Sequence, residues 1–378
     1  MNKKTDAILR KLSEIAQNPK QSVLALMRRT GKKAIGCFPV YSVEELIHAA
    51  GMLPIGMWGA QTDFLHADKY LPAFACSIMK ENLELAMRGA YDMLSAVTIS
   101  SLCDTFKCTM ANWHTVLGDK IPVVPLMFPH NRKTQNGVDY LIRELRSIQT
   151  RLTEISQKTV TDADLADSMA IYEASRQALR EFVALCNDYP VTVDAKIRHL
   201  VIKASYFMDR GEYLETLNEL NAELKAQPKE DADVVKVVLT GIIAEPDGLL
   251  NLLTDNRMRV VADDLAQESR QFRTPARPGL RAIEQMAYRI SDQVGCPLLF
   301  EEQKSRGRML IDLAKNNKAH GVIVVLLKFC DPEEYDYPIC KAELEAAGIP
   351  HLMIEIDHNA KNFETLRTRI QSFAEILQ

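Results

Sequence analysis

Two short apolar runs in this chain end in the same way, and this repeat limits the folds that the chain can adopt. The run Val97–Leu102 is followed directly by Cys103 and an aspartate, and the run Val322–Leu327 is followed, two residues later, by Cys330 and an aspartate. Runs of this length and β-branched composition predict buried strands of parallel sheets. Ligands of open α/β sheets bind beyond the carboxyl ends of the strands. The two thiols therefore predict one metal site shared by the two halves of the chain.

Alternating strands and helices surround each run, which predicts parallel sheets with right-handed crossovers. We predict an α/β fold of two small doubly wound parallel-sheet domains, Rossmann- or flavodoxin-like, with the metal site in the cleft between them. The predicted domains are a first α/β domain with an N-terminal helix at 1–135, a helical segment at 136–230 and a second α/β domain at 231–378. The predicted strands are 33–39, 52–58, 95–100, 121–126, 234–241, 258–262, 321–327 and 351–356.

Composition narrows the class of protein. The chain has 378 residues, a formal net charge of −4, 47% hydrophobic residues and 25% charged residues, which is typical of a globular protein of two or three domains. No basic run is long enough to predict a nucleic-acid partner. The N-terminus leads into a charged amphipathic helix, so we expect no signal peptide. No apolar run reaches the roughly 18 residues of a membrane span. We expect a cytoplasmic protein with no membrane association.

The eight cysteines are too sparse for a disulfide framework, so free thiols or metal ligands are expected. Cys103 and Cys330 are the best ligand candidates, because both follow predicted strands. Cys76 is the third, because it opens a predicted helix whose free amides favour a thiolate. The alternative is that these cysteines are buried apolar thiols. Cys37, at the end of the first strand, is the strongest competitor as a ligand, and its role stays open.

The spacing of the thiols bears on the kind of metal. Structural zinc sites usually contain close cysteine pairs, and no Cys-x-x-Cys occurs here. Three widely separated thiolates favour an iron-sulfur cluster with one coordination position that the protein does not fill.

Other motifs give weaker predictions. Asp263, Asp264 and Glu268 are interpreted either as a cation or acid-base site or, with more weight, as surface carboxylates at a strand-to-helix turn. Arg270 is expected to pair with them or to contact a neighbouring subunit. No Gly-x-Gly-x-x-Gly or Gly-x4-Gly-Lys-Ser/Thr motif is present, so a classical nucleotide site is not predicted. No feature of the sequence supports a flavin site.

An ordered set of segments resembles the 2-hydroxyacyl-CoA dehydratase family. The resemblance spans residues 30–378, and the cysteine motifs look most like the smaller, β-type subunit. The segments that carry it are 36–54, which reads Gly-Cys-Phe-Pro-Val-Tyr-Ser-Val-Glu-Glu-Leu-Ile-His-Ala-Ala-Gly-Met-Leu-Pro, then Leu102-Cys103-Asp104-Thr105, Asp263-Asp264 with Glu268-Ser269-Arg270, and Phe329-Cys330-Asp331-Pro332-Glu333-Glu334.

The resemblance implies a hydro-lyase subunit that holds a 4Fe-4S cluster on Cys76, Cys103 and Cys330. It also implies a homologous α subunit as partner in a heterodimer or heterotetramer, and a separate ATP-dependent iron-sulfur activator that supplies one electron. In the family, that electron reduces the thioester carbonyl of a 2-hydroxyacyl-CoA to a ketyl radical, which expels the 2-hydroxyl group. Loss of a C3 proton and return of the electron for the next turnover then yield the enoyl-CoA. The substrate lies mainly at the α subunit, so this chain is expected to relay the electron. The enzymes are oxygen-sensitive and belong to anaerobic amino-acid fermentation.

Two alternatives stay open. One is a subunit of a benzoyl-CoA reductase-type enzyme, which consumes electrons stoichiometrically. The other is a non-catalytic metal-binding protein that has kept the fold. The sequence does not identify the acyl group, the fourth cluster ligand or the cluster potential, and no catalytic side chain is assigned.

Overall fold

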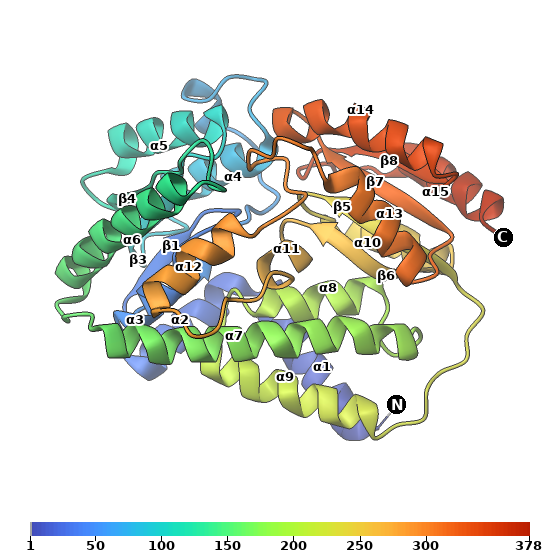
Figure 1. Ribbon diagram of the computed structural model, residues 1–378, viewed down its shortest axis with the longest axis horizontal. Helices are drawn as coiled ribbons and strands as arrows, with labels where there is room; N and C mark the ends of the chain where they lie inside the picture. Colours follow the sequence, from blue (N-terminus) through green and yellow to red (C-terminus); the bar gives the residue numbers. More distant parts are fainter. Residues whose placement is uncertain (1) are drawn as a thin grey trace.

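The computed structural model describes residues 2–378 and contains two four-stranded sheets whose strand pairings are all parallel (Figure 1). The first sheet has the order β2-β1-β3-β4 and the second has the order β6-β5-β7-β8, so the same order occurs twice. The predicted α/β class with two doubly wound sheets is confirmed. The strands are β1 Ala34–Cys37, β2 Leu53–Gly56, β3 Leu94–Ser100, β4 Val123–Leu126, β5 Val235–Gly241, β6 Met258–Leu265, β7 Gly321–Leu327 and β8 His351–Ile356.

The strand order sets where a ligand can bind. In each sheet the first and third strands are neighbours at the centre. The second strand lies outside the first, and the fourth lies outside the third. The loops after the first and third strands therefore diverge, and this point of divergence is where open α/β sheets bind their ligands. The two third strands, β3 and β7, are the runs that precede Cys103 and Cys330. Every residue of β7 is buried, because helices cover both faces of the sheet.

Helices connect and cover the strands. Those of the first half are α3 Glu44–Ala49, the 3-10 turn η1 Ala67–Lys69, α4 Ser77–Met87 and α5 Asp104–Leu117. Those of the second half are α10 Asp247–Asp255, α11 Ser269–Phe272, α12 Ala282–Ser291, α13 Arg306–Asn316, α14 Asp331–Ala346 and α15 Glu364–Ile376. The remaining helices are α1 Lys3–Gln17, α2 Pro19–Thr30, α6 Gln135–Ser156, α7 Asp162–Leu185, the 3-10 turn η2 Cys186–Asp188, α8 Ala195–Ala204 and α9 Arg210–Lys225.

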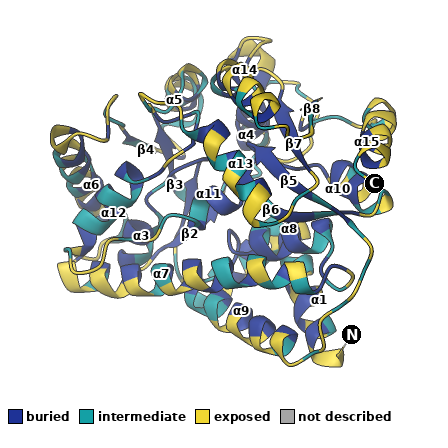
Figure 2. Cartoon of the chain, turned by 45° about the vertical axis from the view of Figure 1, so that its right-hand side comes forward, coloured by how far each residue is buried: buried dark blue, intermediate teal, exposed yellow. Residues whose placement is uncertain are grey.

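Helices α7, α8 and α9 of the helical segment, together with α1, form a layer beneath both sheets, whereas α6 lies beside the first sheet (Figure 1). Leu12 of α1, Phe182 of α7 and Leu217 of α9 share one buried core with residues of α8. The inner faces of these helices are buried and their outer faces are exposed (Figure 2). The N-terminal helix α1 thus packs with the helical segment, on α8 and α9. The predicted domain limits at 135/136 and 230/231 stay predictions.

One helix of the second half packs on the first half. α12 lies against α6 and α7, and its Ile283, Met286 and Ile290 join the core that packs beneath β1 and β3 (Figure 1). The buried guanidinium of Arg132, just before α6, donates hydrogen bonds to the carbonyls of Ile290, Gln293 and Phe300. The two halves are therefore tied together by apolar packing and by backbone hydrogen bonds.

Candidate functional site

Cys76, Cys103 and Cys330 line one cavity of ≈ 390 Å³ between the two halves of the chain. Each of them is the residue that immediately precedes a helix: Cys76 precedes α4, Cys103 precedes α5 and Cys330 precedes α14. A helix N-terminus presents free N–H groups and a partial positive charge, which stabilise a thiolate. The structure thus brings all three candidate ligands to one place, each in the same electrostatic setting.

The topology explains this convergence. The cavity is lined by residues that follow the first and third strands of both sheets: Pro39 and Val40 after β1, Leu102 and Cys103 after β3, Ile242 after β5, and Phe329 and Cys330 after β7. The two divergence points therefore open onto one shared space. Cys76 joins them from the loop between β2 and β3. The cleft between two sheets that the sequence predicted is present, and the strand ends on both sides of it face the same cavity.

Burial controls the protonation of these thiols. Burial raises the pKa of Cys76 to about 12, raises that of Cys103, and raises that of Cys330 well above its ordinary value. The negative charges of Glu333 and of the other two cysteines raise the pKa of Cys330 further, whereas the hydrogen bond from the backbone N–H of Glu333 lowers it. Three thiolates in one buried cavity repel each other, so the thiolate state of the set requires a bound cation. The donor set fits a polynuclear iron centre in this respect.

Within residues 2–378, no three His, Cys, Asp or Glu side chains gather tightly enough to hold a single metal ion. A cluster of several irons and sulfides separates its cysteine ligands further than a single ion does. The cavity of ≈ 390 Å³ has room for a group of that size.

The other cysteines lie elsewhere. Cys37 is buried beneath the first sheet in the core shared with α3, α6 and α12, and it is not among the residues that line the cavity. Cys108 is exposed on α5, five residues after Cys103. Cys186, Cys296 and Cys340 are buried at separate places in the fold, and they too do not line the cavity. The alternation of side chains along β1 gives the physical reason, because it places Cys37, like Ile35, on the face of the sheet that α3, α6 and α12 cover.

The model of the 2-hydroxyglutaryl-CoA dehydratase D-component family matches residues 39–377 of this chain. The chain belongs to this family. It is 42% identical to the lactoyl-CoA dehydratase beta subunit of Anaerotignum propionicum, over 99% of this chain and 100% of that protein. It is 39% identical to the (R)-phenyllactyl-CoA dehydratase beta subunit of Clostridium sporogenes, over 99% of both chains. Identity to a benzoyl-CoA reductase subunit of Thauera aromatica is 22%, over 92% of this chain and 91% of that protein.

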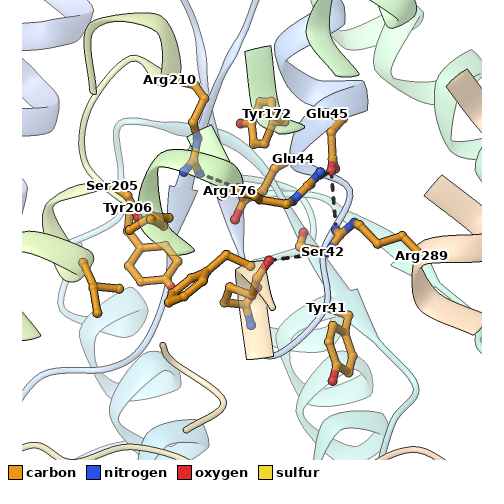
Figure 3. Close-up of a pocket in the computed structure, with 14 residues that line it drawn as sticks. Tyr41, Ser42, Glu44, Glu45, Tyr172, Arg176, Ser205, Tyr206, Arg210 and Arg289 are labelled. Atoms are coloured by element: carbon orange, nitrogen blue, oxygen red, sulfur yellow. Dashed lines mark hydrogen bonds and ion pairs between the residues drawn. The ribbon is translucent and has the colours of Figure 1, made fainter. Parts of the chain in front are cut away.

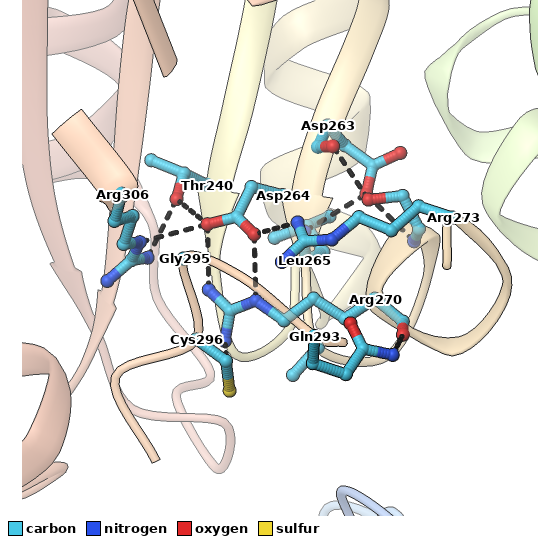
Figure 4. Close-up of polar contacts among 12 residues, drawn as sticks. Thr240, Asp263, Asp264, Leu265, Arg270, Arg273, Gln293, Gly295, Cys296 and Arg306 are labelled. Carbon is cyan, nitrogen blue, oxygen red and sulfur yellow. Dashed lines mark hydrogen bonds and ion pairs between the residues drawn. The ribbon is translucent and has the colours of Figure 1, made fainter. Parts of the chain in front are cut away.

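In this family member, the aspartate pair at the end of β6 is part of the interior, so the interpretation as surface carboxylates is wrong. β6 continues to Leu265, three residues beyond the predicted strand, and both Asp263 and Asp264 are buried. Arg270 binds both oxygens of Asp264, at 2.9 Å each, as one of the two sequence interpretations expected (Figure 4). Burial alone would raise the pKa of Asp264, but the charges of Arg270, Arg273 and Arg306 lower it well below its ordinary value. The carboxylate is therefore held ionised.

This charge network reaches the helix that begins after Cys330. Glu333, in the first turn of α14, lies 3.3 Å from Arg270 Nη2 and 2.8 Å from Arg306 Nη2. Arg306 Nε also binds Asp264, at 2.9 Å. All of these groups are buried. Asp264 and the two arginines therefore fix the N-terminus of α14, and with it the position of Cys330, through Glu333.

A second buried network holds the helix that follows Cys76. His358 Nδ1 lies 2.6 Å from Glu81 on α4, and the His358 backbone N–H donates to the Ser77 hydroxyl at 3.2 Å. On its other side, His358 Nε2 lies 3.5 Å from Glu245, which binds His199 Nε2 at 2.9 Å. Burial alone would lower the pKa of both histidines, but hydrogen bonds to the carboxylates raise it to about 9. Both imidazoles are therefore protonated at neutral pH.

Sequence reasoning missed Glu333, Arg306, Glu81 and His358. A weak signal existed for Glu333, because it stands three residues after a candidate ligand, where its side chain turns back to the start of the helix. No local signal existed for Arg306 or His358. Arg306 is 42 positions from Asp264 in the sequence, and His358 is 277 positions from Glu81.

Proposed function

We propose that this chain is the β subunit of an (R)-2-hydroxyacyl-CoA dehydratase, a hydro-lyase, in which Cys76, Cys103 and Cys330 hold a 4Fe-4S cluster. One observation carries the proposal: three cysteines that lie far apart in the sequence, two in the first half and one in the second, line one cavity at the strand ends of both sheets. The near full-length similarity to two dehydratase β subunits supports the assignment of the subunit.

The chemistry of the proposed substrate demands such a group. A 2-hydroxyacyl thioester has no acidic hydrogen at C3, so ordinary base catalysis does not eliminate water from it, and a one-electron donor must come from a cofactor. When bound, a 4Fe-4S cluster takes up and releases one electron. The residues of this chain supply the thiolates, the amides of three helix N-termini, and an apolar wall of Ile78, Leu102, Phe106, Leu298 and Leu327 that limits access of water.

The proposed role in the enzyme is electron relay. A related α subunit would bind most of the acyl-CoA, and an ATP-dependent iron-sulfur activator would deliver the electron to the complex. The β-subunit names of the relatives, and the coverage of their full length, support the need for a partner chain. We therefore expect no turnover by this chain alone, and turnover by the isolated chain would contradict the relay.

The second candidate is a subunit of a benzoyl-CoA reductase-type enzyme. The similarity to the Thauera aromatica protein supports it, but the identity is only 22%, compared with 42% to the lactoyl-CoA dehydratase subunit. Electron stoichiometry separates the two functions. A dehydratase forms enoyl-CoA without net consumption of electrons, whereas a reductase consumes electrons in proportion to its product. An anaerobic assay of the full complex with several 2-hydroxyacyl-CoA thioesters and with benzoyl-CoA decides between them. Product formation that scales with reductant supplied would reject the dehydratase.

The ligand assignment is tested by Cys103→Ala with Cys108→Ala as the matched control on the same helix. We expect about four irons and four acid-labile sulfides per chain in anaerobically purified protein, as for one 4Fe-4S cluster. Cys103→Ala and Cys330→Ala should lose most of the iron and keep the far-UV helical signal. Cys108→Ala, whose thiol is exposed and outside the cavity, should keep the iron. One zinc per chain, or full iron in either ligand variant, would overturn the proposal.

A further inference from the structure

A second cavity, of ≈ 30 Å³, lies on the other side of the segment that walls the cysteine cavity. Pro39 and Val40 line the cysteine cavity, and the next two residues, Tyr41 and Ser42, line this one. The remaining wall comes from α3, α7, the end of α8, the start of α9, α11 and α12. The cavity therefore sits where the first half, the helical layer and the second half meet. It contains none of the cysteines.

The charges that line this cavity do not balance. Three arginines, Arg176, Arg210 and Arg289, face two glutamates, Glu44 and Glu45, so the lining carries one more positive than negative charge. Figure 3 shows Arg210 beside Glu44 on one side, and Arg176 and Arg289 around Glu45 on the other. Glu173, which does not line the cavity, pairs with Arg176 but also with Arg180, so the excess is unchanged. An uncompensated buried cation is costly.

Donor groups at this cavity lack partners. The hydroxyl of Tyr172 is buried, the Arg210 guanidinium carbon lies 4.5 Å from the centre of its ring, and its O–H has no hydrogen-bond acceptor among the described residues (Figure 3). The Nε–H groups of Arg210 and Arg289 are likewise buried and unpaired within the described part of the chain. Burial, together with the charges of Arg289 and Arg210, lowers the pKa of Arg176 well below its ordinary value. Unpaired buried donors and crowded cations both indicate a missing anionic acceptor.

We propose that this cavity binds one small inorganic anion, of which chloride is the physiological candidate. A volume of ≈ 30 Å³ exceeds the roughly 10–15 Å³ that one water centre needs, so a monatomic halide fits. The anion accepts from the unpaired N–H and O–H donors and offsets the excess positive charge. It thereby fastens the segment Tyr41–Glu45 to the helical layer, behind the wall of the cysteine cavity. The proposal does not depend on iron binding.

The test measures thermal unfolding of the full chain, purified anaerobically, in sodium chloride and in sodium gluconate at equal ionic strength. Gluconate is too large for the cavity. We expect the unfolding midpoint to rise by about 2 °C or more at saturating chloride, because binding to the folded state alone stabilises it. Crystals grown in sodium bromide should show an anomalous bromide peak inside the cavity. Equal midpoints in the two salts, or a cavity that holds only water in bromide, would overturn the proposal.

Two variants and one control assign the effect to this cavity. Arg289→Gln removes the excess charge and should abolish the chloride-dependent rise. Tyr172→Phe removes one hydroxyl without changing charge, and should raise the chloride concentration at half effect about tenfold, as expected for loss of a hydrogen bond to a charged group. If Arg289→Gln does not fold, the Tyr172→Phe variant still tests the site. Arg281→Gln, an exposed arginine just before α12 that pairs with Glu284, should behave as the parent chain. An unchanged chloride response in Tyr172→Phe would place the anion elsewhere and reject the site.

Discussion

Cys103 and Cys330 occupy equivalent positions in the two halves, after the third strand and before a helix, but their surroundings differ. The first turn of α5, after Cys103, carries an exposed pair of Asp104 and Lys107, 3.1 Å apart. The first turn of α14, after Cys330, carries the buried Glu333, which contacts two buried arginines. The start of the helix after Cys103 is thus held only by an exposed ion pair, whereas the start of the helix after Cys330 is held by buried ion pairs. The second half, with its buried charge network, is the fixed reference for the proposed cluster.

The largest effect is expected for Arg270→Met. The change leaves the buried carboxylates of Asp264 and Glu333 short of one cation, and breaking a buried ion network by removing one partner costs about 3–5 kcal/mol. Urea unfolding followed by circular dichroism measures this loss in the free energy of unfolding. Lys107→Met, which breaks the exposed pair after Cys103, is the matched control and should differ little from the parent chain. Equal losses in the free energy of unfolding for the two variants would contradict the difference between the two cysteine regions.

A smaller, pH-dependent effect is expected for the helix after Cys76, which is held by a titratable contact. The pKa of His358 and of His199 is raised in the folded chain from 6.5 to about 9 by their carboxylate partners. A raised pKa means that the stabilisation is complete below pH 6.5 and is lost as pH rises through about 9. The free energy of unfolding should therefore fall between pH 7 and pH 9.5.

The histidine assignment is checked with His358→Gln, which should show a shallower fall over the same pH range than the parent chain. His351→Gln is the control, because His351 begins β8 and its ring contacts the Ile349 carbonyl rather than a carboxylate. A slope that is identical in His358→Gln and in the parent chain would show that this contact does not link α4 to the second half.

The smallest effects separate the two helix starts directly. Asp104→Asn should leave the iron content and the stability unchanged within error, because the pair that it breaks is exposed. Glu333→Gln should lower the iron retained after gel filtration, or alter the electron paramagnetic resonance signal of the reduced cluster, because Cys330 then loses its fixed support. This expectation rests on the proposed cluster. Loss of iron in Asp104→Asn, with full retention in Glu333→Gln, would reverse the comparison.

The sequence predicted what depends on local pattern. Both third strands and the helices that follow them are found where the β-branched runs and the Cys-Asp pairs indicated, because a buried parallel strand needs a short apolar run whatever lies around it. The convergence of Cys103 and Cys330 on one cavity also followed from topology, since strand ends of such sheets bound the ligand space, whereas Cys76 joins them from the loop that precedes α4. Their role as ligands stays a prediction.

The sequence prediction was wrong where partners from distant parts of the chain determine whether a side chain is buried. Asp263 and Asp264 looked like surface carboxylates because, apart from Arg270, the local pattern gives no sign of their partners. Arg198, which pairs with Asp263, comes from α8, and Arg306, which pairs with Asp264, comes from α13. Pairing with these arginines is also why β6 runs three residues further than predicted. Charged residues normally end a buried strand, and here they are neutralised within it.

The placement of α12 has a consequence for how the protein can be taken apart. A gene divided in the exposed stretch near Pro228 would give a first fragment lacking the apolar side chains of Ile283, Met286 and Ile290, and a second fragment with those side chains bared to solvent. Neither fragment would keep a closed interior. Although the two sheets have the same strand order, the second half completes the core of the first through α12, so neither half is an independent unit.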